Sequence, residues 1–389
     1  MRHHADPGAV HLDAASSEPL HPAAREVLLS SLDLGYADPR RLHRPGRSAR
    51  MMLDNARQVV AGCLGVRPDE VTFTPSGTHA VHLGLLGLAA GRVRYGSHLA
   101  VSAVEHSSVM HAGQWHAERG GSFDTVRVDA SGRVDLEALR RALDAPDPEL
   151  RPAAVAVQAA NHEVGTVQPI AEVAELARAA DEVPVFMDAC ASMGRLPLPE
   201  GWAVAAGSAH KWGGPAGVGV LLVRKGARWR PPFPVDDRAD PRATGFENVP
   251  GALAAAAALQ AVSETDHSGH HALVERIRSR VAEVPDVEVV GDPTDRLPHL
   301  VTFSFLYVDG EALVSELDRR GLGVASGSAC TASTLTPSHV LAAMGVLTHG
   351  NVRVSLPASV SADELSPHVD RLLQALPDVV SSLRKEAGL

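Results

Sequence analysis

Lysine is almost absent from this 389-residue sequence. Only three of its 36 basic residues are lysines, namely Lys211, Lys225 and Lys385. Because arginine supplies nearly all the positive charge, a lysine in an otherwise uncharged segment is a candidate for what arginine cannot do, which is to lose its proton and act as a nucleophile. We interpret Lys225 and Lys385 as solvated ends of elements, whereas Lys211 lies in the segment GSAHKWGGPAG.

Cysteine is equally scarce. Cys63, Cys190 and Cys330 are odd in number and widely spaced, which argues for free thiols in a reducing compartment. Cys330 stands in the segment ASGSACTAST (residues 325–334), which is rich in small residues. A structural cysteine usually has large apolar neighbours, whereas a reactive one needs access and a means to ionise. Composition alone does not choose between these two interpretations of Cys330.

Long apolar runs are also missing. The longest alanine-rich run, residues 251–262, is too short to cross a bilayer, and the first twenty residues contain no apolar segment typical of a secretory signal. The net charge of −10 gives no attraction to nucleic acid or acidic membranes. The arginine-rich segment 39–50 has no aromatic residue for base stacking, so we interpret it as an active-site or partner-facing loop. We expect a cytoplasmic protein without direct membrane or nucleic-acid partners.

What the sequence does contain, from about residue 55 to 225, is an alternation of helices and short apolar strands. Several strands are apolar throughout, as expected for strands covered by helices on both faces, so this part predicts an α/β domain. After a proline-rich break at 228–242, a long helix over about 248–283, two strands and further helices predict a smaller α+β domain. The strands predicted in the first part lie at 71–73, 98–103, 153–160, 183–189, 203–209 and 217–223.

Polar side chains follow these strands where each one ends. Ser76, Gly77 and Thr78 stand between a strand and a helix, where backbone N–H groups and a hydroxyl either bind an anion or cap the helix. Because ligands of open α/β sheets lie at the carboxyl ends of the strands, we expect the other strand-end residues to converge on the same place. These residues are His106, Asn161, His162, Asp188, Ser208, His210 and Lys211.

An anion site, a flat imidazole, a carboxylate and a rare lysine together suit pyridoxal phosphate. The phosphate needs a helix N-terminus with hydroxyls, the aldehyde needs an amine, the ring nitrogen needs a carboxylate and the ring face needs a flat partner. The amine must be neutral to react, so we expect apolar or cationic surroundings at Lys211. The histidines at 267–271 and the pair His79 and His82 have no clustered cysteines or carboxylates, so we expect no metal site.

Five longer motifs make the resemblance to a family specific. SAHKWGGPAGVGVLLVRKG, DACASMGRLP, EHSSV, NHEVGTVQPI and SGSACTASTLTPSHVLAAMG resemble segments of class V aminotransferase-fold enzymes, in particular the cysteine desulfurases of the IscS/NifS type. The resemblance covers essentially the whole chain. It implies the type I, aspartate aminotransferase-like fold of pyridoxal-phosphate-dependent transferases, with a mainly parallel seven-stranded sheet in a large domain (16–250). It also implies a small α+β domain (1–15 and 251–389) that carries the cysteine loop.

The resemblance further implies roles for single residues. Lys211 would bind the aldehyde of the cofactor covalently, Asp188 would hold its pyridine nitrogen, and His106 would stack on its ring and assist proton transfers. Arg353, in NVRVSL, would bind the substrate carboxylate as a fork. Cys330 would accept sulfur on a loop that we expect to be mobile. The cofactor phosphate would be held by Gly77, Thr78, Ser208 and His210.

Three positions depart from the pattern of the family. Ala191 stands where the family commonly has a glutamine that donates to the phenolic oxygen of the cofactor, and His162 stands where it commonly has asparagine. We infer that His162 takes over the contact to that oxygen and assign Asn161, beside it, to substrate binding. The threonine that the family lends to the phosphate of the other subunit corresponds most nearly to Thr244, offset by a residue or two.

The implied function is that of a homodimeric cysteine desulfurase, which converts L-cysteine into L-alanine and leaves a persulfide on Cys330 for an acceptor protein. Alternatives on the same scaffold are a selenocysteine lyase and an aminotransferase or kynureninase-like hydrolase. A sulfur carrier or scaffold that has lost the cofactor is an alternative of another class, against which Lys211 argues. The sulfur acceptor stays open between an iron–sulfur scaffold, a thiolation enzyme and a DNA-modification protein, as in a DNA phosphorothioation system.

Overall fold

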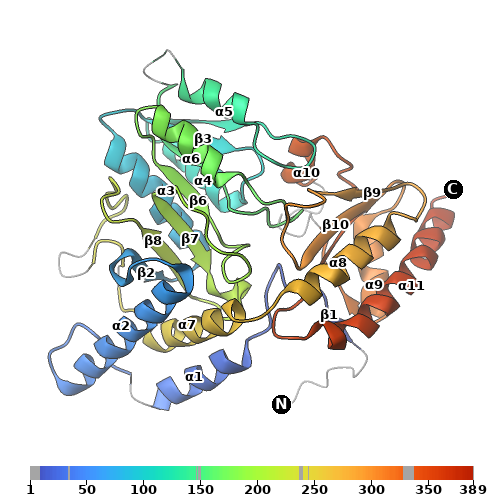
Figure 1. Ribbon diagram of the computed structural model, residues 1–389, viewed down its shortest axis with the longest axis horizontal. Coiled ribbons are helices and arrows are strands. Elements are labelled where there is room, and N and C mark those ends of the chain that lie inside the picture. Colours follow the sequence, from blue (N-terminus) through green and yellow to red (C-terminus); the bar gives the residue numbers. More distant parts are fainter. Residues whose placement is uncertain are drawn as a thin grey trace.

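The computed structural model describes residues 9–33, 36–145, 147, 150–235, 240–243, 245–326 and 337–388. They form a larger and a smaller part that lie side by side (Figure 1). The larger part contains a seven-stranded sheet in the order β2-β8-β7-β6-β5-β3-β4, in which all strands except β8 run in the same direction. The strands are β2 (Val71–Thr74), β3 (His98–Ser102), β4 (Ser122–Val126), β5 (Pro152–Ala156), β6 (Val185–Asp188), β7 (Val204–Ser208) and β8 (Gly219–Val223). The prediction of a mainly parallel seven-stranded sheet is confirmed.

Helices cover both faces of this sheet. Along β3, Leu99 and Val101 belong to the core on one face and Ala100 to the core on the other. Both faces of the strands are therefore buried, which explains their nearly continuous apolar sequence. On one face lie α3 (Gly77–Arg92) and α4 (Ser107–Ala117), and on the other lie α2 (Arg44–Leu64), α5 (Leu136–Leu143), α6 (Ile170–Ala179) and α7 (Val249–Ser263), with α1 (Pro22–Asp33) packed on α7.

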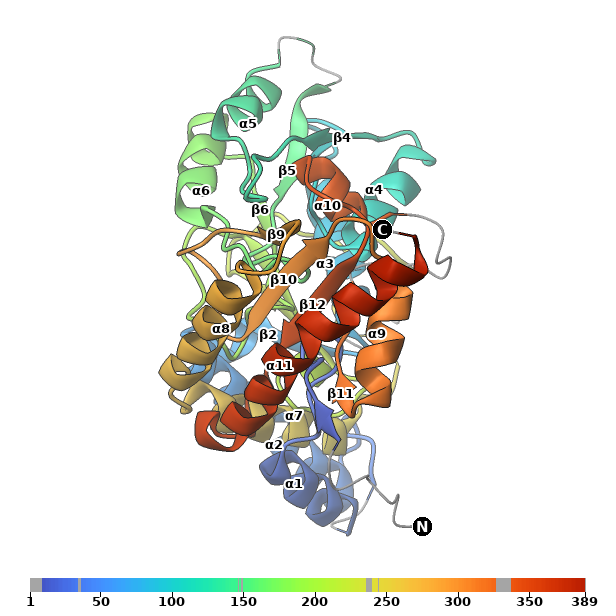
Figure 2. The ribbon, with the colours of Figure 1, turned by 90° about the vertical axis from the view of Figure 1, so that its right-hand side faces the viewer.

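The smaller part is an antiparallel sheet in the order β12-β10-β9, with a layer of helices on one face (Figure 2). Residues alternate between its two faces, as in any strand. Val301 and Phe303 pack against the helices, whereas Thr302 donates to the backbone oxygen of Glu163 in the larger part (2.6 Å). Its main elements are α8 (Ser268–Val281), β9 (Val287–Val290), β10 (Leu300–Phe305), α9 (Gly310–Arg319), α10 (His339–Met344), β12 (Asn351–Ser355) and α11 (Ala362–Glu386), together with β1 (Val10–His11), which pairs in parallel with β11 (Leu322–Gly323).

Two sequence expectations need comment. The single long helix expected over 248–283 is wrong, because α7 ends at Ser263 and α8 begins at Ser268. The side chain of Asp266 accepts the N–H of Ser268 (2.9 Å) and so favours a new helix start. The core residues of α7 pack with the larger sheet and those of α8 with the smaller one. The division of the chain at residue 250 stays a prediction.

A buried ion pair joins the two parts. Arg195, which follows β6, donates to the carboxylate of Glu18 (2.6 Å), and each side chain is only 1% exposed. Glu18 also accepts the backbone N–H of Ala358, just after β12. A charge pair this deeply buried is strongly destabilising when one partner is removed, because the other charge is then left unpaired. The pair therefore ties the N-terminal segment to both parts. Within the described residues, no helix is long and apolar enough to cross a membrane.

Three buried or half-buried histidines lie around Arg195. Burial and the nearby guanidinium lower the pKa of His267 to about 4. The same two causes, in the same order, lower the pKa of His270 and hold that of His299 well below its ordinary value. Nε2 of His270 faces the backbone oxygens of Pro357 and Val360. These imidazoles are therefore neutral in the folded protein near neutral pH.

Replacing His299 with Asn should reduce the loss of stability on acidification. A histidine whose pKa is lower in the folded than in the unfolded state favours the unfolded chain as the pH falls from about 7 toward 5. Over this range, urea unfolding should show that the wild type loses at least ~1 kcal/mol more of its free energy of unfolding than the variant. The exposed His271 of α8 is the matched control, and H271N should follow the wild type. Equal losses in wild type and H299N would contradict this assignment.

Candidate active site

A cavity of about 180 Å³ lies at the carboxyl edge of the large sheet. The parallel strands β3, β5, β6 and β7 all end at this edge, so the residues that follow them meet there. The cavity is lined by strand-end residues named from the sequence, Gly77, Thr78, His106, His162, Asp188, Ser208, His210 and Lys211. Further lining residues are Val81, Ser108, Gln158, Ala160, Cys190 and Ala191.

One end of the cavity is built to receive an anion. Helix α3 begins at Gly77, and the Ser76 hydroxyl accepts the N–H of His79 (3.0 Å). The first N–H groups of a helix have no acceptor within the helix, and they carry the positive end of its dipole. A Cβ on Gly77 would lie 2.5 Å from Cβ of Ser208, so glycine is what allows α3 to start against β7. Oγ of Ser208 is 3.0 Å from Nδ1 of His210.

A carboxylate and an amine lie elsewhere along the same cavity. Asp188 ends β6, is only 6% exposed and accepts the N–H of Cys190 (2.9 Å). Lys211 ends a short 3-10 turn that follows β7. Its Nζ donates to the backbone oxygens of Ala15 and Ser16, the latter at 3.1 Å. The N-terminal segment thus reaches the amine from the side of the smaller part.

His106 is held as a neutral imidazole. It caps the N-terminus of α4, where Nδ1 accepts the N–H of Ser108 (3.1 Å). Burial, His162 and Lys211 lower the pKa of His106 to about 4. Because Nδ1 is the acceptor, the single ring proton of the neutral form sits on Nε2. The rings of His106 and His162 meet edge to face with centroids 5.0 Å apart.

Arg353 places a guanidinium next to the cavity. It lies on β12, on the face of the small sheet that is turned toward the large part, and is 3% exposed. Nη1 donates to the backbone oxygen of His162 (3.0 Å), and Nη2 donates to Oδ1 of Asp13 (2.8 Å) and to Oγ of Ser16. Nε is buried and has no acceptor among the described residues, so this side of the guanidinium is left for a carboxylate ligand.

Three predicted residues are not among the described residues that line the cavity. Asn161 is fully buried in the turn after β5, where its side chain accepts the N–H groups of Glu163 and Val164. It is not among the described residues that line the cavity, and its role in substrate binding stays a prediction. Cys330 and Thr244 lie outside the described residues. The mobile cysteine loop and the phosphate contact across a dimer therefore stay predictions as well.

The sequence analysis did not identify the buried carboxylates of Glu105 and Glu163, nor the raised pKa of the Cys190 thiol. Glu105 is completely buried, and burial, followed by the charge of Asp188, raises its pKa well above the usual range. Its only sequence signal is its place before His106. Glu163 is also buried, and its Oε1 lies 3.6 Å from Nε2 of His162. Burial raises the pKa of the Cys190 thiol, so this cavity-lining cysteine is a protonated and poor nucleophile.

The residues of the cavity fit pyridoxal phosphate. The N-terminus of α3 and the Ser208 hydroxyl suit its phosphate, and Asp188 suits its ring nitrogen. The His106 ring offers a flat partner, and Lys211 offers the amine for the aldehyde. Gly77, where a Cβ would meet Ser208, lets the N–H groups at the start of α3 lie close to the Ser208 hydroxyl at this end of the cavity.

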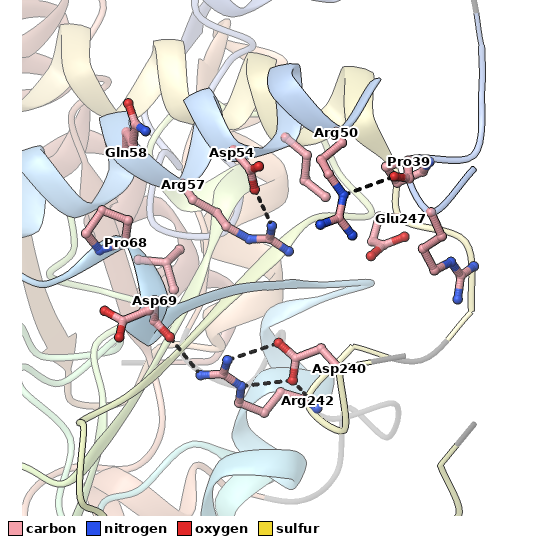
Figure 3. Close-up of a pocket in the computed structure, with 13 residues that line it drawn as sticks. Pro39, Arg50, Asp54, Arg57, Gln58, Pro68, Asp69, Asp240, Arg242 and Glu247 are labelled. Carbon is pink, nitrogen blue, oxygen red and sulfur yellow. Dashed lines mark hydrogen bonds and ion pairs between the residues drawn. The ribbon is translucent and has the colours of Figure 1, made fainter. Parts of the chain in front are cut away.

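A larger cavity, of about 510 Å³, lies between α2 and residues 240–247. Its arginines are matched by acceptors, as Figure 3 shows for Arg242 with Asp240 and for Arg57 with Asp54. Among the described residues, the two cavities have no lining residue in common. The smaller cavity holds His106 and His210, whose pKa values burial lowers to about 4, beside Asp188 and Lys211, and is therefore the better candidate for chemistry.

Comparisons with known proteins agree with this geometry. The sequence pattern of the family described as Aminotransferase class-V matches residues 10–367. The chain is 31% identical to Cysteine desulfurase IscS of Methanosarcina thermophila, over 98% of this chain and 94% of the relative. It is 36% identical to Cysteine desulfurase of Cereibacter sphaeroides, over 96% of each. A solved structure titled NifS-like protein superposes with a TM-score of 0.85 and 27% identity, over 96% of this chain and all of the other.

The variant Gly77→Ala should bind pyridoxal phosphate more weakly. The added methyl group would meet Ser208 and the sulfur of Cys190, so the start of α3 has to move away from β7. A shift of its N–H groups by about 1 Å should lower the affinity for the cofactor roughly 10-fold or more. Absorbance titration of cofactor-free protein measures the change. Gly62→Ala on α2 is the matched control, since a Cβ there would have no described atom within 4 Å. Equal affinities for G77A and wild type would show that the start of α3 does not hold the phosphate.

Proposed function

Because the chain belongs to the Aminotransferase class-V family, we propose that it is a cysteine desulfurase that uses pyridoxal phosphate to convert L-cysteine into L-alanine and a protein-bound persulfide. The observation that carries the proposal is the cavity that brings Lys211, Asp188 and His106 together with the N-terminus of α3. The long matches to relatives named cysteine desulfurase support this substrate over others.

The cofactor would be held at each of its polar groups. Gly77, Thr78, Ser208 and His210 suit the phosphate, Asp188 the ring nitrogen, Lys211 the aldehyde and His162 the phenolic oxygen. When bound, pyridoxal phosphate supplies an aldehyde that reacts with amines and a ring that accepts electrons from the substrate. Asp188 would keep the ring nitrogen protonated, because an acceptor carboxylate stabilises the N–H form.

Arg353 binds the carboxylate of L-cysteine. Asp13 and Ser16 hold its Nη2, and the backbone oxygen of His162 holds Nη1, so the fork is oriented before the substrate arrives. Orientation in advance lowers the entropy that binding must overcome. The carboxylate would therefore lie between the two parts, and Lys211, once its amine is neutral, would take the α-proton.

Cys330 receives the sulfur. Its thiolate attacks the sulfur of the bound cysteine, a sulfur–sulfur bond forms, and the carbon–sulfur bond of the substrate breaks. The carbon keeps the electron pair and takes up a proton, so alanine leaves and the persulfide stays on the enzyme. Cys190 is a poor alternative nucleophile, because burial raises the pKa of its thiol.

A second copy and an acceptor protein complete the proposal. Exposed apolar side chains cluster near α1 and α2, and the rings of Tyr36 and Phe246 stack there at 5.7 Å. An exposed patch of this kind favours a homodimer that covers it. Thr244 lies next to this patch in the sequence, as expected for a residue that reaches the other subunit. We place the enzyme in the cytoplasm, and the acceptor stays open between the three classes named above.

Two variants test the proposed function. Wild-type protein incubated with L-cysteine and a thiol reductant should form alanine and sulfide in equal amounts. Lys211→Ala should lose the yellow absorbance of the bound cofactor and at least ~100-fold of the alanine rate, and Cys330→Ser should lose sulfide release. Lys225→Ala is the matched control, because Lys225 is exposed.

The alternatives give different results. A C330S variant with full sulfur transfer would contradict the role of Cys330 and would favour an aminotransferase or hydrolase, which needs no such thiol. A wild-type protein that cannot bind pyridoxal phosphate would favour a scaffold. Relative rates on L-cysteine and L-selenocysteine separate a desulfurase from a selenocysteine lyase.

A further inference from the structure

We propose that His162, oriented by Glu163, is the imidazole that takes a proton from the bound amino acid in this cavity, whereas His106 is only a hydrogen-bond donor. The inference rests on the proposed function and deepens it. Cysteine desulfurases of the IscS/NifS type commonly have an asparagine at this position. An asparagine could not perform the role assigned to His162, because an amide does not accept a proton near neutral pH.

The two nitrogens of His162 have different surroundings. Nε2 lies 3.6 Å from Oε1 of Glu163. Nδ1 is buried and has no hydrogen-bond partner among the described residues, although the side chain lines the cavity. With Nε2–H toward the carboxylate, the lone pair of the neutral ring lies on Nδ1, which can donate to the phenolic oxygen of the cofactor only after it has taken up a proton. The acceptor nitrogen is therefore the one that no other described group uses.

Glu163 is a carboxylate that can stabilise a second proton on this ring. It is 3% exposed, and its Oε2 accepts the hydroxyl of Ser338 (2.6 Å). Burial by itself raises the pKa of Glu163, but His162, Ser338 and His339 together hold it below its ordinary value. An ionised carboxylate behind an imidazole fixes its orientation and stabilises the imidazolium, as the aspartate does in a serine protease triad.

His106 lacks this arrangement. Its Nδ1 is occupied by the N–H of Ser108, so only Nε2–H is directed elsewhere, and burial lowers its pKa to about 4. A second proton would have to displace the cap of α4. The rings of the two imidazoles lie 5.0 Å apart, but only His162 has a nitrogen that is free, within the described part of the chain, to accept a proton. Two titratable groups with such different surroundings can take different acid–base roles in one site.

The proton comes from the amino group of the substrate. Free L-cysteine carries an ammonium group at neutral pH, and only the amine can attack an aldehyde. Arg353, which binds the carboxylate, donates to the backbone oxygen of His162 (3.0 Å), so the amino group on the adjacent carbon lies near His162. An N–H bond of the ammonium breaks, an N–H bond forms at Nδ1, and the amine nitrogen keeps the electron pair.

Three charged groups lie near His162. They are Glu163 in its own turn, Arg353 on β12 and Lys211 in the same cavity. His106 at the start of α4 and His339 on α10 are the other titratable imidazoles nearby, and Asp188 faces the same cavity. Because an imidazolium cannot accept a proton, kcat/KM should fall on the acid side of its pH profile.

Replacing each histidine by asparagine separates the two roles. H162N should lower kcat/KM about 100-fold and remove the acid limb of the pH profile, which is the fall of kcat/KM at low pH. H106N should lower the rate and leave that limb in place. If His162 only replaces the hydrogen bond of the usual asparagine, H162N will keep the wild-type rate and profile, and the proposal falls. Loss of the limb in H106N alone would also overturn it.

Glu163→Gln tests the positioning residue. Glutamine can still accept from Ser338 but carries no charge, so the acid limb should move to lower pH. Ser338→Ala removes the hydrogen bond and keeps the charge, so its limb should stay near that of the wild type. An unmoved limb in E163Q would exclude the role of Glu163.

A readout independent of turnover keeps this proposal separate from the proposed function. In the full-length protein with ¹⁵N-labelled histidine, the resonance lost in H162N should show an unprotonated Nδ1 that gains its proton at lower pH in E163Q than in the wild type. A proton already on Nδ1 at neutral pH would contradict the proposal. Failure of the wild type to form alanine would instead contradict the proposed function and leave this spectrum unaffected.

Discussion

Burial of the large sheet on both faces is the constraint on which the rest of the structure depends. Neighbouring residues of β3 pack into opposite cores, so the interior of a strand offers no place for a charged group without a large desolvation cost. Polar chemistry is therefore confined to the strand ends. Asp188 closes β6, and His106 and Lys211 stand in the turns that follow β3 and β7. One layer architecture thus positions the whole cofactor-binding set.

The smaller part completes the site from the opposite side. Because residues alternate along β12, a strand that is apolar toward the helices can present Arg353 toward the large sheet. The N-terminal segment contacts both parts, through Lys211, Arg353 and the buried pair of Glu18 with Arg195. Cofactor residues and substrate fork therefore come from different parts of the chain, and their spacing depends on how these parts are joined. A displacement of about 1 Å in such a spacing is enough to lower a rate substantially.

The layered fold and most strand positions could be predicted, because apolar strands and strand-end polar residues are local patterns. The break between α7 and α8 was missed, since it depends on a local hydrogen bond from the N–H of Ser268 to the side chain of Asp266 within an otherwise helical sequence. Strand β4 was missed because it is an edge strand with exposed residues and no continuous apolar run.

The identities of most residues around the cavity could be predicted, but their hydrogen-bond and ion-pair partners could not. Lysine scarcity singled out Lys211, and its position after a strand placed it near Asp188. Nothing in the sequence shows that Nδ1 of His106 caps a helix, or that Glu163 faces His162. Such contacts depend on rotamers and on elements far apart in the chain, which only the three-dimensional structure brings together.

The central claim, that this cavity transfers sulfur from L-cysteine to Cys330, is tested most directly by peptide mass spectrometry. After a short incubation with L-cysteine under non-reducing conditions, the peptide that contains Cys330 should be heavier by one sulfur atom. The peptides that contain Cys63 and Cys190 should be unchanged. An unmodified Cys330, or sulfur found on Cys190 instead, would contradict the account.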